Sequence, residues 1–206
     1  MPTRRIQLQN AYYLIRHGEA VSNQNDILIS SIERSSESPL TEKGLDQVKI
    51  MCSRLRGESI TRIVASDFLR TQETAQELSK CLAVSVEYDL RLRERFLGDF
   101  DGCHIDKMKS HIALNDLQWE QCSHGMEPYG VVLDRMLEAF TDLESTYQGE
   151  SIAIVSHSAP LRILRGWLYG IRGAELSPRS ITMNQVAELA NAEVLKVTER
   201  IEKELG

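Results

Sequence analysis

Residues 11–20 read AYYLIRHGEA, an apolar run that changes abruptly into charged and small residues. Five consecutive apolar residues bounded by polar ones are typical of a strand buried on both faces of a parallel sheet. Arg16 and His17 follow directly, at the carboxyl end of that strand. Because open parallel sheets bind their ligands at this end, the pair is a candidate for part of a functional site.

The alternation of apolar runs and helical patterns continues along the chain. Further strands are expected at 61–65, 84–88 and 151–155, with two short edge strands at 186–189 and 193–197. Helices are expected at 41–56, 68–80 and 129–147, and another begins near Pro160, a residue tolerated in a first turn. This order favours an α/β fold, a three-layer sandwich with a mostly parallel central sheet flanked by helices.

Between residues 92 and 128 the pattern is less regular, and roughly 103–128 is interpreted as a small inserted lid. The chain is otherwise expected to form one domain over residues 1–206, a length that suits an α/β domain with a modest insertion. His104, His111 and His124 are expected to line or cover the lid. Trp119 and Met126 are expected to pack within it.

Bulk composition argues against several classes of protein. The net charge of −6 disfavours a nucleic-acid binder, which usually has a basic face. No apolar run approaches 18 residues, and no signal-peptide pattern follows the first arginines, so a cytoplasmic protein without membrane contact is expected. Four dispersed cysteines without a CxxC pair favour reduced thiols over disulfides: Cys52, Cys81, Cys103 and Cys122.

Polar clusters follow four of the apolar runs: residues 16–19 (RHGE), 66–70 (SDFLR), Glu94 and 156–158 (SHS). In a parallel sheet these ends converge, which gathers two histidines, two arginines and a carboxyl group. Arginine neutralises phosphoryl oxygens with a planar fork of donors. Neutral imidazole can attack phosphorus without a base, and a carboxylic acid can protonate the leaving alkoxide. The set suits cleavage of a phosphate monoester and needs no metal or cofactor.

The chain also resembles the histidine phosphatase superfamily, in its phosphoglycerate mutase-like branch. Residues 16–18 match the family's Arg-His-Gly, and residues 39–44 (PLTEKG) match its Leu-Thr/Ser-x-x-Gly helix start. Residues 66–75 match Ser-x-x-x-Arg-x-x-x-Thr-Ala, and residues 92–102 match Leu-x-Glu…Gly-x-x-x-Gly. His157 stands where the family has its second histidine, although Ser158 replaces the usual Gly.

The resemblance implies a role for each site residue. His17 would be phosphorylated, Arg16, Arg70 and His157 would grip the phosphate, and Glu94 would be the proton donor and later the base. Asn23 would be a further phosphate ligand, and the backbone N–H of Ser158 could donate as well.

Each residue also has a simpler interpretation. Either histidine could be a satisfied core residue, and Arg70 could be an exposed partner of Glu73 or Glu77. Glu94 could form a surface salt bridge with Arg93 or Arg95, and Asn23 could be a turn former. Cys103, His104, Cys122 and His124 lack the usual zinc-ligand spacings, so zinc is disfavoured.

Two rival functions stay open. A mutase would return the phosphoryl group to a second hydroxyl, but only 157 − 94 = 63 positions separate Glu94 from His157, without the Pro-rich arginine stretch of that family's mutases. The acid-phosphatase branch carries Arg-His-Gly-x-Arg-x-Pro and His-Asp, which this chain lacks. An inactive module that binds a phosphorylated partner is disfavoured, because every expected catalytic position is filled.

The substrate is expected to be a small phosphorylated molecule; its identity and the oligomeric state are not predicted.

Overall fold

A computed structural model describes residues 3–112, 118–178, 180, 182–183 and 186–203. Five strands form a sheet in the order β3-β2-β4-β1-β5. Their bounds are β1 Thr3–Arg16, β2 Arg62–Ala65, β3 Val86–Tyr88, β4 Ser151–Ser156 and β5 Val194–Lys203. The strands from β3 to β1 are parallel, and β5 pairs antiparallel with β1. The mostly parallel sheet is therefore confirmed.

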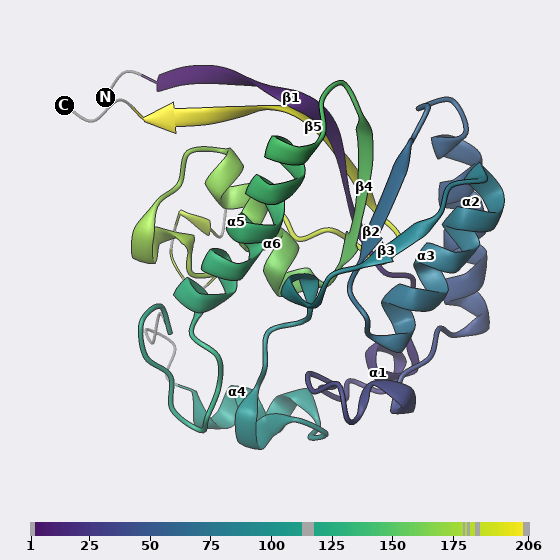
Figure 1. Cartoon of the computed structure of the whole chain (residues 1–206). Helices are drawn as coiled ribbons and strands as arrows, with labels where there is room; N and C mark the ends of the chain where they lie inside the picture. The colour runs from purple at the N-terminus through teal and green to yellow at the C-terminus, as the bar shows by residue number, and fades with distance from the viewer. Residues whose placement is uncertain (1–2, 113–117, 179, 181, 184–185, 204–206) are drawn as a thin grey trace.

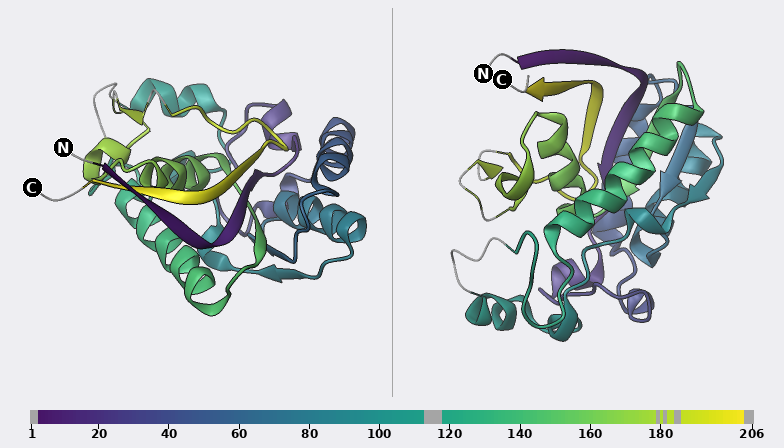
Figure 2. Two further views of the ribbon diagram at one scale, coloured as in Figure 1. Left: turned by 90° about the horizontal axis from the view of Figure 1, so that it is seen from above. Right: turned by 60° about the vertical axis from the view of Figure 1, so that its left-hand side comes forward.

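Helices cover both faces of this sheet, as Figures 1 and 2 show. Helices α2 and α3 lie together on one face, and α5 and α6 lie on the other. The helices are α1 Val21–Gln24, α2 Glu42–Leu55, α3 Leu69–Leu82, α4 Ile105–His111, α5 Tyr129–Thr146 and α6 Ser158–Leu168. Short 3-10 turns are η1 Ser35–Glu37, η2 Leu90–Leu92, η3 Gly98–Phe100 and η4 Gly173–Leu176. The three-layer sandwich is confirmed.

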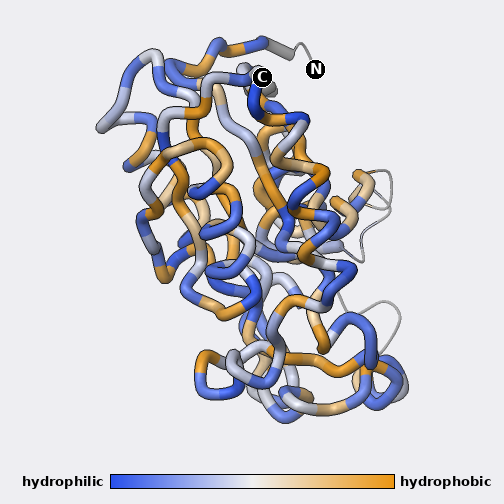
Figure 3. The backbone as a smooth tube through the Cα atoms, turned by 90° about the vertical axis from the view of Figure 1, so that its right-hand side faces the viewer, coloured by the Kyte–Doolittle hydropathy of each residue, from blue (hydrophilic) through white to orange (hydrophobic). Residues whose placement is uncertain are grey.

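The hydrophobic core has two halves, one on each face of the sheet. Because side chains alternate along a strand, Tyr12 and Leu14 of β1 join the cluster under α5 and α6. Tyr13 and Ile15 join the cluster under α2 and α3. Figure 3 shows apolar and polar residues alternating along the helices, and α2, α3, α5 and α6 each bury an apolar side against the sheet.

Four secondary-structure predictions were wrong in extent or kind. β1 begins at Thr3 instead of residue 11, and β5 continues to Lys203, because the two form a long ribbon that extends past the rest of the sheet (Figure 1). Residues 186–189 are not a strand; Val186 and Leu189 are buried, but the chain there pairs with no strand. The helix α4 lies inside the stretch that was expected to be irregular.

The first turn of α2 packs tightly on the loop after His17. Thr41 caps the helix as expected, accepting a hydrogen bond from the Gly44 N–H at 3.0 Å. A Cβ atom on Gly44 would lie 2.0 Å from the Glu19 carbonyl oxygen, and one on Gly18 would lie 2.7 Å from the Gly44 carbonyl oxygen. The two glycines let the helix and the loop meet backbone to backbone.

We therefore expect Gly44→Ala to destabilise the protein. The added methyl group meets backbone atoms that cannot rotate away, and overpacking of this kind costs about 1–3 kcal/mol. Thermal unfolding should show a melting temperature lower by several degrees. Gly57→Ala is the matched control, because a Cβ there meets nothing within 4 Å. Equal melting temperatures for the two variants would contradict the close approach.

Candidate active site

The polar clusters converge beyond the carboxyl ends of the strands, where α1 and α4 lie (Figure 1). A cavity of about 490 Å³ opens there, lined among others by six of the seven predicted residues: Arg16, His17, Asn23, Arg70, Glu94 and Ser158. The seventh, His157, is buried below the cavity with its ring centroid 5.3 Å from that of His17. β1 and β4 hold this pair together, because Arg16 and Ser156 are partners in the parallel register.

His17 is buried and held in one tautomer. Its Nδ1 lies 2.7 Å from the Gly18 carbonyl oxygen. A carbonyl oxygen only accepts, so Nδ1 carries the proton. The lone pair of the neutral ring is then on Nε2, where it accepts a hydrogen bond from Arg70 Nε at 3.1 Å. The atom suited to nucleophilic attack therefore lies against a guanidinium group.

The buried guanidinium group of Arg70 and the partly buried one of Arg16 are the nearby cations that affect His17. Arg70 Nη2 donates to the Ile29 carbonyl at 3.1 Å, and Arg16 Nη1 donates to the Leu189 carbonyl at 2.9 Å. Arg70 Nη1 and Arg16 Nε are buried and have no hydrogen-bond partner among the described residues. Each arginine is thus anchored by a backbone carbonyl and keeps a donor for a ligand.

His157 and Asn23 complete this end of the cavity. His157 Nε2 lies 2.9 Å from the Ser66 hydroxyl, while its buried Nδ1 has no partner in the described part of the chain. The Asn23 side-chain oxygen accepts from the Ala20 N–H at 3.0 Å and from Asn191 Nδ2 at 3.3 Å. Asn23 therefore shapes its own turn and also lines the cavity.

Glu94 enters the cavity from the segment after η2. One of its carboxylate oxygens, Oε1, accepts from the N–H of Arg95 at 2.9 Å. Burial raises the pKa of this carboxyl group, against the opposing effects of Arg70, the Arg95 N–H, Arg16 and Arg135. Glu94 consequently keeps its proton at a higher pH than an exposed glutamate would.

Burial and nearby positive charge also decide the state of the two histidines. The pKa of His17 is well below its ordinary value, first because of desolvation and then because of Arg70. The pKa of His157 is lowered for the same two reasons in the same order. Burial lowers the pKa of Arg70 to about 10, which still leaves it cationic near neutral pH. The site therefore combines neutral imidazoles with charged guanidinium groups, a combination suited to a phosphate dianion.

A family model described as the histidine phosphatase superfamily (branch 1) matches residues 12–199. The chain belongs to the histidine phosphatase superfamily. A protein of Photorhabdus laumondii named probable phosphoglycerate mutase GpmB is 32% identical over 168 residues, which cover 77% of this chain and 74% of that protein. A protein of the same name from Yersinia pestis is also 32% identical over 168 residues, with the same coverage of both chains.

Solved structures of phosphatases and of a phosphoglycerate mutase share the fold of this chain. A mycobacterial glucosyl-3-phosphoglycerate phosphatase complexed with VO3 has a TM-score of 0.78 at 20% identity, covering 95% of this chain and 98% of that one. YhfR of Bacillus stearothermophilus has a TM-score of 0.72 at 28% identity over 81% of this chain and 83% of that one. A phosphoglycerate mutase of Bacillus anthracis has a TM-score of 0.75 at 18% identity over 96% of this chain and 89% of that one.

The structure shows that the salt-bridge interpretations of Arg70 and Glu94 are wrong. Arg70 is buried and bonds His17, whereas Glu73 accepts from the Leu40 N–H and Glu77 pairs with Lys80. Beside Glu94, the guanidinium of Arg93 pairs with Asp67, and that of Arg95 binds the Glu127 carbonyl. Neither neighbouring arginine uses its side chain to neutralise the Glu94 carboxylate.

The cysteine and histidine residues of the predicted lid do not form a metal site, although the rings of His111 and His124 lie with their centroids 6.1 Å apart. Within the described residues, no group of three or more His, Cys, Asp or Glu side chains could hold a metal ion. His104, His111 and His124 lie in the lid region but are not among the cavity-lining residues. Met126 packs with Phe100 and Ile112 as expected. Trp119 packs against the core cluster under α5 and α6, so its predicted packing within the lid is wrong. The four cysteines form no disulfide, and the described helices include none that could cross a membrane.

Several lining residues were not predicted. Arg162 of α6 donates to Glu188 at 2.8 Å and to the Met183 carbonyl at 2.9 Å, and the hydroxyl of Ser158 donates to the same Glu188 carboxylate at 3.1 Å. Asn191 donates to the His17 carbonyl at 3.2 Å. Arg162 lies one helical turn after Ser158, which is a signal that could have found it. Glu188 lies in the segment 186–189 that was wrongly predicted to be a strand, and Asn191 lies in the short segment before β5.

The buried histidines predict a dependence of stability on pH. Unfolded imidazoles bind protons near pH 6.5, while folded His17 and His157 stay neutral to a lower pH, so acidification favours unfolding. Between pH 6.5 and 5, the free energy of unfolding should fall by up to about 1.4 kcal/mol per pH unit for each histidine. Urea unfolding of wild type and of the His17→Gln, His157→Gln double variant isolates this contribution. Parallel pH curves for the two proteins would refute it.

Proposed function

We propose that this protein is a metal-independent phosphatase that hydrolyses phosphate monoesters through a phosphohistidine intermediate on His17. The observation that supports the proposal is the set of three buried nitrogens without a partner among the described residues: Arg16 Nε, Arg70 Nη1 and His157 Nδ1. They belong to the residues next to His17: Arg70 bonds His17 Nε2 at 3.1 Å through its Nε, the His157 ring centroid lies 5.3 Å from that of His17, and Arg16 directly precedes His17 in the chain. Leaving buried donors unpaired is costly, and a phosphoryl group would satisfy them.

In the first step, the substrate phosphate replaces His17 as the hydrogen-bond partner of Arg70. His17 Nε2 then attacks phosphorus in line, and its lone pair forms the N–P bond while the P–O bond to the alcohol breaks. Glu94 gives its proton to the departing oxygen. Arg16, Arg70 and His157 hold the phosphoryl oxygens, with Asn23 and the Ser158 N–H as further donors. Positioning and charge neutralisation supply most of the reduction in barrier.

In the second step, water attacks the phosphohistidine. Glu94, now a carboxylate, accepts a proton from the water as the O–P bond forms. The N–P bond breaks, its electron pair returns to Nε2, and inorganic phosphate leaves. One residue performs both proton transfers because it is left in the basic form by the first step.

The chemistry at the far end of the cavity favours hydrolysis over mutase action. Phosphoglycerates carry a carboxylate besides their phosphate, so a mutase needs a cation for it. Arg162 is engaged by Glu188, and Arg95 by the Glu127 carbonyl and the Tyr129 ring. A second anionic group would have to displace Glu188. Because relatives are named phosphoglycerate mutase, mutase action remains the second candidate, and a screen of phosphorylated metabolites by phosphate release separates the two.

The remaining parts of the proposal concern partners and location. The substrate is a small phosphorylated molecule, and no cofactor, nucleic acid or membrane takes part. A cytoplasmic location belongs to the same proposal. An inactive module that binds a phosphorylated partner is not favoured, because His17, both arginines and the acid line one cavity and His157 lies against His17.

His17→Ala should abolish turnover while the fold is retained. Removal of a nucleophile normally costs several orders of magnitude, so activity should fall below about a hundredth of wild type. Released phosphate from p-nitrophenyl phosphate measures it, in excess EDTA, where the wild type should remain active. His111→Ala is the control, since this histidine is exposed and does not line the cavity. A phosphatase that survives loss of His17 would have another nucleophile.

Glu94→Gln should slow esters with poor leaving groups far more than esters with good ones. An alkyl phosphate leaves as a basic alkoxide that needs a proton, and general acid catalysis is typically worth about 10²–10⁴-fold. A nitrophenolate needs no proton, so its single-turnover burst should change much less. The phosphoenzyme should accumulate as acid-labile, base-stable label on His17. Equal slowing of both esters without accumulation would show that Glu94 only positions its neighbours.

A further inference from the structure

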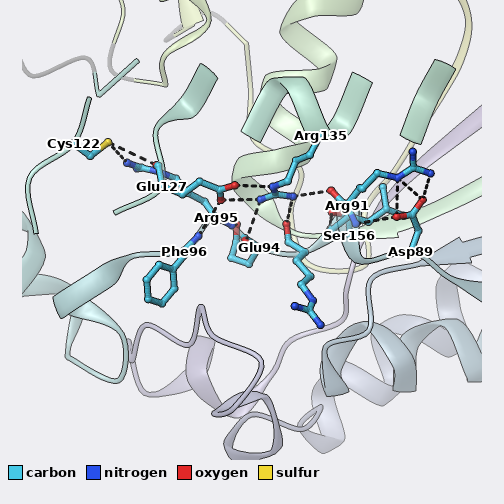
Figure 4. A network of polar contacts seen from close by, with 11 residues as sticks. Asp89, Arg91, Glu94, Arg95, Phe96, Cys122, Glu127, Arg135 and Ser156 are labelled. Carbon is cyan, nitrogen blue, oxygen red and sulfur yellow. Dashed lines mark hydrogen bonds and ion pairs between the residues drawn. The ribbon is translucent and has the colours of Figure 1, made fainter. Parts of the chain in front are cut away.

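Arg135 of α5 binds the backbone on which Glu94 is carried. Its Nη1 donates to the carbonyl oxygens of Arg91 and Arg93, both at 2.7 Å, and its Nη2 donates to the carbonyl oxygen of Glu94 at 3.2 Å. Figure 4 shows this guanidinium group between the three carbonyls and the carboxylate of Glu127. A planar fork with five donors suits this task, whereas a lysine offers a single point of charge.

Glu127, at the end of the lid, holds the same segment from the other side. Its carboxylate accepts from Arg135 Nε at 2.8 Å and Nη2 at 3.0 Å, and from the backbone N–H of Phe96 at 3.2 Å. Its backbone forms two more bonds, accepting from Arg95 Nε at 2.6 Å and donating to the Phe96 carbonyl at 2.9 Å. The chain on both sides of Glu94 is thus tied to one ion pair.

The environment of this pair makes it stronger than a surface salt bridge. The side chains of Arg135 and Glu127 are each only 17% exposed. Their hydrogen bonds combine charge, partial burial and bidentate geometry, which are the conditions under which such contacts matter. The fork of Arg135 is fully used by backbone and Glu127, and Arg135 is not among the residues that line the active-site cavity. It can affect the reaction through the Glu94 segment and through its charge, which also helps to lower the pKa of His157.

We propose that the Arg135–Glu127 pair is the positioning device that aims the Glu94 carboxyl group at the leaving oxygen. This inference rests on the proposed role of Glu94 as general acid. Ser156 supports the arrangement, because its hydroxyl donates to the Leu92 carbonyl at 2.7 Å and so joins the segment to the end of β4 beside His157. The segment that carries Glu94 is thereby held by Arg135 of α5, by Glu127 and by the end of β4, which directly precedes His157.

Charge gives the pair a second effect, which can be measured separately. The positive charge of Arg135 lowers the pKa of Glu94, opposing the larger effect of burial. Removing that charge should let the pKa of Glu94 rise. The alkaline limb of kcat/KM, which reports the acid of the free enzyme, should then move to higher pH.

The experiment compares Arg135→Met and Arg135→Lys with wild type and Glu94→Gln, using an alkyl phosphate and p-nitrophenyl phosphate. Misplacement of a catalytic group can cost about 10²-fold, so both Arg135 variants should lose about 10- to 100-fold with the alkyl ester and much less with the aryl ester. The alkaline limb of kcat/KM should move to higher pH in Arg135→Met and stay near its wild-type position in Arg135→Lys, which retains the positive charge. In a Glu94→Gln background, Arg135→Met should add no further loss selective for the alkyl ester.

Arg172→Met is the matched control. Arg172 also binds two backbone carbonyls, those of Trp167 and Ile171 at 2.7 and 2.8 Å, but lies at the end of α6 and does not line the cavity. It should leave the ratio of the two ester rates unchanged. Equal slowing of both esters by Arg135→Lys, with Glu94→Gln still selective, would reduce Arg135 to structural support. A Glu94→Gln variant without selectivity would instead overturn the role of the acid.

Discussion

The hydrogen bond from His17 Nδ1 to the Gly18 carbonyl is the constraint on which the site depends. It places the lone pair on Nε2, and burial keeps the ring neutral. The parallel register of β1 and β4 then brings His157 beside it, while the absence of a side chain at Gly18 and Gly44 lets the start of α2 support the loop from behind. Neutrality and orientation of one imidazole thus involve both neighbouring strands and a helix.

This arrangement is costly for the folded protein in the absence of a ligand. Arg16 and Arg70 are held by backbone carbonyls instead of carboxylates, and each keeps a buried nitrogen without a partner among the described residues. Buried donors without partners destabilise a fold. The two-faced core of the sheet supplies the compensating stability, since its central strands are buried on both sides. The packed core on both faces of the sheet therefore stabilises the fold, whereas the destabilising unpaired donors lie at the active site, at the carboxyl ends of the strands.

The parts of the fold and of the site that could be predicted are those marked by a local pattern of apolar and polar residues. Apolar runs that end in polar clusters predicted that six site residues lie near one another, because parallel strands end at one edge, whereas Asn23 came only from the family resemblance. The first half of β1 was missed because its ribbon with β5 is polar on one face, with Arg5 paired to Glu199 at 2.9 Å. Arg135 was also missed, since its acceptors are carbonyl oxygens 41 to 44 positions away. Side chains that bind distant backbone leave no signal in residue spacing. The extent of the lid, roughly 103–128, stays a prediction.

The opposing influences on Glu94 explain how one carboxyl group could act first as an acid and then as a base. Burial raises its pKa, and Arg70 and Arg16 lower it. In the proposed reaction these same arginines bind the substrate phosphate. A dianion between them offsets their charge, so phosphate binding raises the pKa of Glu94 further and favours the protonated form when a proton must be given. Once the alcohol has left with that proton, Glu94 is a carboxylate beside the phosphohistidine. Water entering there meets a base whose proton affinity is still raised by burial and by the bound phosphoryl group, which is the condition required for the second step.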